Sequence, residues 1–173
     1  MTKQQNDLPA NIDTSVIIVA ILRRGDVRLH VAFVSRVKDV VDFHTRHKLL
    51  VLAHSEPHYR KLGRIVAEAK QSPIAAAYEQ YSQLFMEGLA RHATAKKHAN
   101  VLEHMMGYFS KVLSKEERKE LLELTNDFRQ RLIPLVVPLT LFRHYVKKYR
   151  VTYLENQIYL QPSPKELMLR NHV

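Results

Sequence analysis

Between residues 37 and 150 the chain repeats one pattern, in which a helix-start signal precedes apolar residues spaced three or four positions apart. Ser, Thr or Pro stands at each start after the first, where a side-chain oxygen or the missing proline N–H suits the first helical turn. Only 4 glycines and 7 prolines interrupt 173 residues. The sequence therefore predicts a mainly α fold, a single-domain bundle of about five or six helices. The first helix is expected from Val37 to His54, and later starts at Ser55, Ser72, Thr94, Ser114 and Pro138.

Two of these signals fix the phase of the predicted helices. Ser114 and Glu117 have the spacing of a capping box, and Pro134 is expected to end the helix before it. On the faces that follow, Val112 and Leu132 are expected to point toward the core with the larger apolar side chains. The residues predicted to be buried together are Leu102, Met105, Phe109, Leu124, Phe128 and Phe142.

The N-terminal segment has a different pattern from the helical part. Residues 1 to 14 are polar and read as an arm, and a β-branched run from Val16 to Leu22 follows. Alternating apolar residues from Val27 to Phe33 then suggest a β-hairpin, although runs this short fit a helix nearly as well. We therefore divide the chain into an arm with a possible N-terminal β-hairpin over residues 1–38 and a helical domain over residues 39–173.

Composition restricts the function. The chain has no cysteine, which excludes disulfides, thiolate nucleophiles and iron–sulfur clusters held by this chain alone. No apolar run approaches the length of a membrane-spanning helix, so we expect a cytoplasmic protein with no membrane contact. Neither a phosphate-binding glycine loop nor a metal-ligand motif occurs, so we expect no cofactor and no metal. The net charge of +10 favours a polyanionic partner.

The positive charge gathers at both ends of the helical part. Residues 36 to 70 carry eight Lys or Arg against four acids, and residues 134 to 173 carry six against two. The last long helix has an apolar face and a basic face, and no acid lies between Pro134 and Arg150 to pair with the cations. Either this basic face binds an anion, or its cations are simply exposed to solvent. The basic face consists of Arg143, His144, Lys147, Lys148 and Arg150.

A second basic group opens the helix that Thr94 caps. Lys96 and Lys97 fall in its first turn, where the helix dipole favours acids. A phosphate bound at the exposed N–H groups would resolve this conflict, with Asn100 one turn on as a further contact. Otherwise the two lysines extend into solvent at a small cost.

Histidines and tyrosines accompany the basic residues. His44 and His47 share a helix face beside Arg46 and Lys48, an arrangement that suits phosphate contact or acid–base chemistry better than metal binding. Plain surface is the alternative for this group. Tyrosines near Lys or Arg could stack on unpaired bases, but most of them are expected to be buried in the bundle. Tyr149 and Tyr153 are the best candidates for exposure. The tyrosines near basic residues are Tyr59, Tyr108, Tyr149, Tyr153 and Tyr159.

Five segments of the chain form a recognisable set: DFHTRHKLLVLAHS, HYRKLGRIVA, KKHANVLEHMMGYF, LIPLVVPLTLFRHYV and the terminal PKELMLRNHV. Together they resemble the YbgA family, a small bacterial domain of unknown function. They occur in the family's order and span residues 42 to 173. The family occurs alone, often encoded beside a DNA photolyase, and also fused behind a desulfidase-like domain that binds an iron–sulfur cluster. Those fusions are associated with removing sulfur from thiolated uridine in tRNA.

The resemblance implies that this part grips tRNA while a cysteine-bearing partner does the chemistry. Because this chain lacks the cluster domain, any desulfidase activity must be supplied in trans or be absent. The expected function is a non-catalytic RNA-binding module, with RNA, and tRNA in particular, as its partner and an iron–sulfur desulfidase-like protein as a possible second partner. The alternatives are a histidine-dependent nucleotide-processing enzyme and a protein-interaction bundle.

The candidate residues follow from charge and from the matching motifs. We expect nucleic-acid contacts from Arg46, Lys48, Arg60, Lys61, Lys96, Lys97, Asn100, Arg143, Lys147, Lys148, Arg150 and Arg170. Acid–base or phosphate contacts are expected from His44, His47, His98 and His144, with no residue assigned to catalysis or metal binding.

Overall fold

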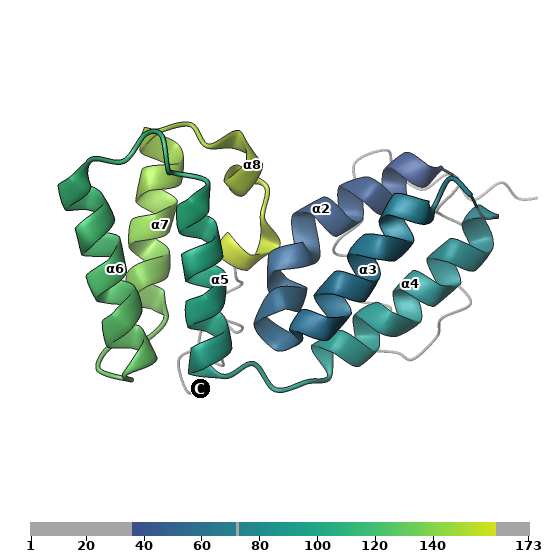
Figure 1. Cartoon of the computed structure of the whole chain (residues 1–173), viewed down its shortest axis with the longest axis horizontal. Coiled ribbons are helices and arrows are strands. Elements are labelled where there is room, and N and C mark those ends of the chain that lie inside the picture. The colour runs from purple at the N-terminus through teal and green to yellow at the C-terminus, as the bar shows by residue number, and fades with distance from the viewer. Residues whose placement is uncertain (1–35, 72, 162–173) are drawn as a thin grey trace, which may run out of the picture.

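A computed structural model describes residues 36–71 and 73–161, and all regular structure in these ranges is helical (Figure 1). The mainly α prediction is confirmed, whereas the predicted hairpin lies outside the described residues. Six helices in these ranges have at least 13 residues. The elements are α2 (Val37–His54), α3 (Glu56–Glu68), α4 (Ile74–Leu89), α5 (Ala95–Gly107), α6 (Lys115–Arg129), α7 (Val136–Lys148), α8 (Thr152–Glu155) and the 3-10 turn η2 (Ile158–Leu160).

The predicted caps set the starts of α5 and α6. The Thr94 hydroxyl accepts a hydrogen bond from the Lys97 backbone N–H at 3.4 Å. At α6 the capping box is complete, because Ser114 Oγ accepts from the Glu117 N–H at 3.1 Å and the Ser114 N–H donates to Glu117 at 2.9 Å. These local bonds explain why the sequence alone locates both helix starts.

The end of α6 differs from the prediction. The helix ends at Arg129, before the chain reaches the predicted terminator Pro134, and a Schellman motif closes it. In this motif the Leu132 N–H donates to the Asp127 carbonyl at 2.9 Å while Arg131 adopts a φ of 64°. The chain leaves the helix axis there, so Leu132 is 68% exposed instead of buried. The same motif ends α7, where Arg150 has a φ of 49°.

The helices form two groups that share α2. Figure 1 shows α3 and α4 on one side of α2 and the α5–α6–α7 group on the other. The smaller core consists of Val40, Val51, Leu62, Tyr78, Tyr81 and Phe85. The larger core lies among α5, α6, α7 and the C-terminal turns, and takes Leu49, Leu52 and Ala53 from α2.

The predicted core is largely confirmed within the larger group. Five of the six predicted residues are buried there, and the sixth, Leu124, is half-buried. Val112, expected on the core side, is 42% exposed because α5 already ends at Gly107. Gln157 ties the C-terminal turns to α2, since its Nε2 donates to the Thr45 carbonyl at 2.8 Å. This hydrogen bond holds the C-terminal turns against α2.

Candidate nucleic-acid interface

Three surface hollows hold many of the basic residues singled out by the sequence. The largest, which we call the α2–α5 hollow, measures about 760 Å³ and lies where α2 ends and α3 and α5 begin. The α7–α8 hollow and the α3–α4 hollow each measure about 550 Å³. The α2–α5 hollow is lined by Leu52, His54, Ser55, Glu56, Pro57, Arg91, Lys96, Lys97, Asn100, Glu103 and Arg129.

Hydrogen bonds across the α4–α5 connection shape the α2–α5 hollow. His54, the last residue of α2, donates from Nδ1 to the Arg91 carbonyl at 2.7 Å. The Lys97 ammonium donates to the His54 carbonyl at 2.8 Å and to the His92 carbonyl at 2.7 Å. The connection is thus fastened to the end of α2, and the start of α5 is held against it.

These bonds also resolve the unfavourable placement of Lys97 at a helix start. Its ammonium reaches the carboxyl end of α2, where the helix dipole favours a cation. An ammonium has three donors, and two of them are used in these bonds. Lys97 therefore has a structural role and keeps one donor for an anion in the hollow.

Arg91 and Lys96 give the α2–α5 hollow an excess of positive charge. Both carboxylates in its lining already have cationic partners: Glu103 with Arg129, and Glu56 with Arg60 at 2.6 Å. Among the described residues no carboxylate forms an ion pair with Arg91 or Lys96. An anion that binds in the α2–α5 hollow can therefore neutralise the positive charge of Arg91 and Lys96.

The α7–α8 hollow contains the basic face predicted on the last long helix. Arg143 and Lys147 line it, opposite Glu155, Gln161 and the apolar Leu154 and Leu160. Arg143, Lys147 and Arg150 are all exposed, as the face pattern predicts. The face therefore exists, although an acid of α8 lies at its edge.

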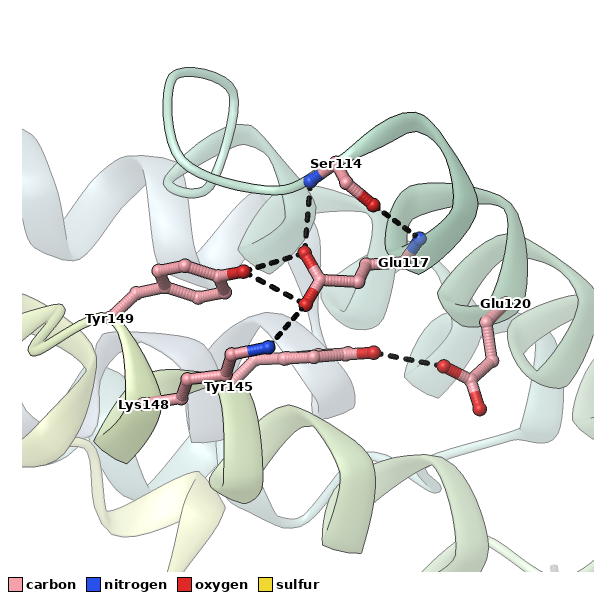
Figure 2. Close-up of polar contacts among 6 residues, drawn as sticks. All are labelled: Ser114, Glu117, Glu120, Tyr145, Lys148 and Tyr149. Carbon is pink, nitrogen blue, oxygen red and sulfur yellow. Dashed lines mark hydrogen bonds and ion pairs between the residues drawn. The ribbon is translucent and has the colours of Figure 1, made fainter.

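Lys148 belongs to a closed polar network between α6 and α7 (Figure 2). Its ammonium lies 2.7 Å from Glu117 Oε1, and the Tyr149 hydroxyl donates to the same carboxylate at 2.7 Å. Beside them the Tyr145 hydroxyl donates to Glu120 at 2.8 Å. The sequence showed no acid near Lys148 because its partner comes from the preceding helix.

Glu117 therefore has two tasks, closing the capping box of α6 and pairing with α7. Hydrogen bonds from Lys148, Tyr149 and the Ser114 N–H lower the pKa of its carboxyl to about 2. The side chain stays ionised at physiological pH and holds Lys148 in place. We accordingly give Lys148 a structural role and leave it out of the interface proposed below.

The candidate histidines occupy the interior more than the surface. His47 is buried and stacks on Phe43, donating from Nδ1 to the Phe43 carbonyl at 2.8 Å. His98 is buried with its Nδ1 2.8 Å from the Tyr159 hydroxyl. His44 lies 3.1 Å from the Tyr81 hydroxyl, and burial, followed by nearby Lys48, lowers its pKa to about 4. His144, in contrast, is exposed on α7.

The remaining candidates are spread over the first helices. Arg46 is half-buried on α2, and Arg60 on α3 makes the ion pair with Glu56. Lys61 is exposed and lines the α3–α4 hollow. Lys48 places its ammonium 4.8 Å from the ring centre of Tyr153. Arg170 lies outside the described residues.

The structure brings some candidates together and separates others. Lys96, Lys97 and Asn100 share the α2–α5 hollow, as their spacing predicts. They do not join Lys147 or Arg150, because α5 and α7 run parallel and the intervening segment of chain, α6, runs antiparallel to both. The start of α5 and the end of α7 therefore lie at opposite ends of the group (Figure 1). The basic group at the start of α5 therefore does not form a single face with the basic face of α7.

Three lining residues of the α2–α5 hollow were missed as candidates. His54 falls inside the quoted segment DFHTRHKLLVLAHS, and Arg91 precedes the helix cap Thr94 by three residues, so the sequence offered a signal for both. Arg129 had no such signal, because it lies on the charge-balanced α6 and reaches the hollow only through its pairing with Glu103.

Two further searches concern residues 36–71 and 73–161 only. No group of three or more His, Cys, Asp or Glu side chains converges there in a way that could hold a metal. No helix in these ranges is both long and apolar enough to cross a membrane.

The described residues form a small helical protein with a basic hollow where α2 ends and α3 and α5 begin. A family model described as "Protein of unknown function (DUF1722)" matches residues 48–164. The "Uncharacterized protein YbgA" of Escherichia coli (strain K12) is 38% identical over 133 residues, covering 76% of this chain and 79% of the relative. The chain therefore belongs to the YbgA family, and the resemblance seen in its motifs is confirmed. No solved structure matches it.

Proposed function

We propose that the protein is a non-catalytic RNA-binding module whose RNA is tRNA. The observation that carries the proposal is the α2–α5 hollow, where Arg91 and Lys96 have no carboxylate partner among the described residues while Lys97 keeps one donor. A cation pair beside the start of α5 suits phosphate, since the helix dipole adds to the attraction. The net charge of +10 supports a polyanion as the partner.

Phosphate contact at the α2–α5 hollow would account for RNA binding, but it gives the protein no catalytic reaction. His47 and His98 are buried, and His44 with a pKa of about 4 is neutral at physiological pH. Of the four candidate histidines only His144 is exposed. These placements favour the RNA-binding reading over the histidine-dependent alternative. In the proposal the module acts in the cytoplasm with a partner enzyme, and desulfuration of thiolated uridine by an iron–sulfur protein is the expected reaction.

Arg143, Lys147 and Arg150 form the second part of the proposed interface. They lie at the other end of the three-helix group from the α2–α5 hollow, so a small RNA fragment would not reach both groups. A folded RNA such as tRNA presents phosphates over a wide surface and could occupy both. Affinity for intact tRNA should therefore exceed affinity for short fragments of it.

A charge-removal experiment tests the hollow. The double variant Arg91→Gln/Lys96→Gln should weaken tRNA binding and reduce the slope of log affinity against log salt by roughly one to two units. The matched control is Arg118→Gln/Lys119→Gln, which removes the same charge from the exposed face of α6. The control should keep a salt slope close to that of the wild type.

Three polyanions separate the possible outcomes. Titrations with tRNA, duplex DNA and heparin should show the tightest binding to tRNA at physiological salt. Equal losses in both double variants would mean that only net charge matters and would remove the hollow from the proposal. Absence of tRNA binding by the wild-type protein would overturn the function itself.

A further inference from the structure

The chain carries an exposed aromatic pair at the end of α5 remote from the α2–α5 hollow. Tyr108 follows the last residue of α5 and is 41% exposed. The ring of Tyr153, on α8, stacks parallel to it at a centroid distance of 4.7 Å and an interplanar angle of 9°. Since Tyr153 is half-buried and covers one face of Tyr108, the open part of the pair belongs to Tyr108.

A cation accompanies this pair. Lys48 of α2 lies with its ammonium 4.8 Å from the centre of the Tyr153 ring. Three elements far apart in the sequence thus converge, with α2 providing the charge and the ends of α5 and α8 the rings. A single exposed aromatic side chain is ordinary in a protein, but an exposed ring beside a cation combines the two features on which single-strand sites rely, base stacking and positive charge.

The pair is held in position before any ligand arrives. Gln157 donates from Nε2 to the Thr45 carbonyl at 2.8 Å and to the Tyr153 carbonyl at 3.4 Å, which fixes α8 against α2. On the other side, the Tyr108 N–H donates to the Met105 carbonyl at 3.0 Å, and the next residue, Phe109, is fully buried. Little conformational freedom would be lost on binding, which favours affinity.

We propose that Tyr108, backed by Tyr153 and flanked by Lys48, is a stacking site for an unpaired base of RNA. The inference rests on the proposed RNA-binding function and adds the kind of nucleotide that is recognised. A flat base can lie on the open face of Tyr108 and extend the existing stack, while Lys48 supplies positive charge for the adjoining phosphate.

The position of the pair complements the α2–α5 hollow. The two sites lie at opposite ends of α5, whose 13 residues span about 20 Å. Phosphates of a structured region would contact the hollow, and a loop with unstacked bases would reach Tyr108. Such a division suits a folded RNA that has both helical and single-stranded parts.

Substitution of Tyr108 tests the proposal with two probes. The probes are a short single-stranded oligoribonucleotide of mixed sequence and the blunt RNA duplex formed from it. Tyr108→Ala should weaken single-strand binding by roughly 5- to 150-fold and leave duplex binding unchanged, because paired bases do not offer their faces. Tyr108→Phe should bind like the wild type, since it keeps the ring.

A matched control removes an exposed apolar side chain elsewhere. Leu122 on α6 is 46% exposed, so Leu122→Ala removes similar exposed area without touching the pair. It should bind both probes like the wild type. A fluorescent purine analogue in the single strand gives an independent signal, because stacking on Tyr108 should quench it in the wild type and in Tyr108→Phe but not in Tyr108→Ala.

The outcomes distinguish this inference from the function on which it rests. If the wild type binds the single strand and Tyr108→Ala binds it equally well without a change in quenching, the stacking site is wrong and the RNA-binding proposal stands. Equal weakening for the single strand and the duplex would also overturn stacking. If the wild type binds neither probe nor tRNA, both proposals fail.

Discussion

At the residue scale, two arginines occupy positions that usually belong to glycine. Arg131 and Arg150 follow the ends of α6 and α7 with φ values of 64° and 49°. A side chain with a Cβ is strained in this left-handed region, and glycine is not. Both arginines thus keep their side chains at a cost to stability, and Arg150 lies on the basic face that we assign to RNA.

We predict that Arg131→Gly and Arg150→Gly each stabilise the protein. Glycine relieves the backbone strain of the folded state but raises the chain entropy of the unfolded state. The first effect on the free energy of unfolding is the larger, so the net gain in stability is about 0.5–1 kcal/mol. Thermal unfolding should show a rise in the midpoint of about 1–4 °C.

The control for this prediction is the residue next to Arg131. Gln130 has an ordinary helical φ of −80°, so Gln130→Gly should lower the midpoint. A lower midpoint in both arginine variants would show that their side chains contribute more than the strain removes. Arg150→Gly should in addition weaken tRNA binding, which would separate stability from function at one position.

At the element scale, α6 and α7 are joined by a single carboxylate with several partners. The Glu117 carboxylate accepts hydrogen bonds from Lys148, Tyr149 and the Ser114 N–H, and its pKa falls from an ordinary 4.5 to about 2. A carboxyl with a lowered folded pKa stabilises the fold fully above its unfolded value. That contribution is lost as the pH falls from about 4.5 to about 2, because the unfolded chain takes up the proton first.

We therefore predict a pH-dependent effect of Glu117→Gln. The variant should have a lower thermal midpoint than the wild type at neutral pH, and the difference should shrink as the pH falls from 4.5 toward 2. Glu123→Gln is the control on the same helix, where the exposed carboxylate lies 3.7 Å from Lys119 and forms a loose surface pair. A difference that stays constant across this pH range would contradict the role assigned to Glu117.

The same network shows what a sequence can and cannot predict about elements. The start of α6 was predictable because Ser114 and Glu117 are three residues apart, and the start of α5 follows from an equally local signal, the Thr94 cap. The pairing of Glu117 with Lys148 was not predictable, because the two side chains meet only after α6 and α7 pack together. For the same reason the sequence could not show that Lys97 would reach the end of α2, nor that His98 would be buried against Tyr159.

At the scale of the whole molecule, α2 contributes to both cores, so we expect them to unfold together. Phe128 is 3% exposed in the larger core. Replacement by Ala should cost about 3–5 kcal/mol, measured by denaturant unfolding. Far-ultraviolet circular dichroism follows all helices, and the tyrosine near-ultraviolet signal comes from both cores, from Tyr78 and Tyr81 in the smaller and from Tyr145 and Tyr159 in the larger. Both signals should show one coincident transition.

Leu132→Ala provides the comparison, because Leu132 lies beyond the end of α6 and is exposed. Its effect should stay within about 0.5 kcal/mol. A cost below roughly 1 kcal/mol for Phe128→Ala would mean that the core is not packed as described. Two separate transitions in either variant would show that α2 does not couple the cores.

The sharing of α2 also has a consequence for biosynthesis. A ribosome completes α2 early, and the residues that cover its smaller-core side, as far as Phe85, follow soon afterwards. The other side of α2 also contacts η2, so its cover is complete only when residues 158–160 have emerged. The nascent chain can therefore close the α2–α3–α4 side first, but until those residues emerge it carries an incompletely covered apolar strip of α2, an interval open to aggregation or to binding by a chaperone.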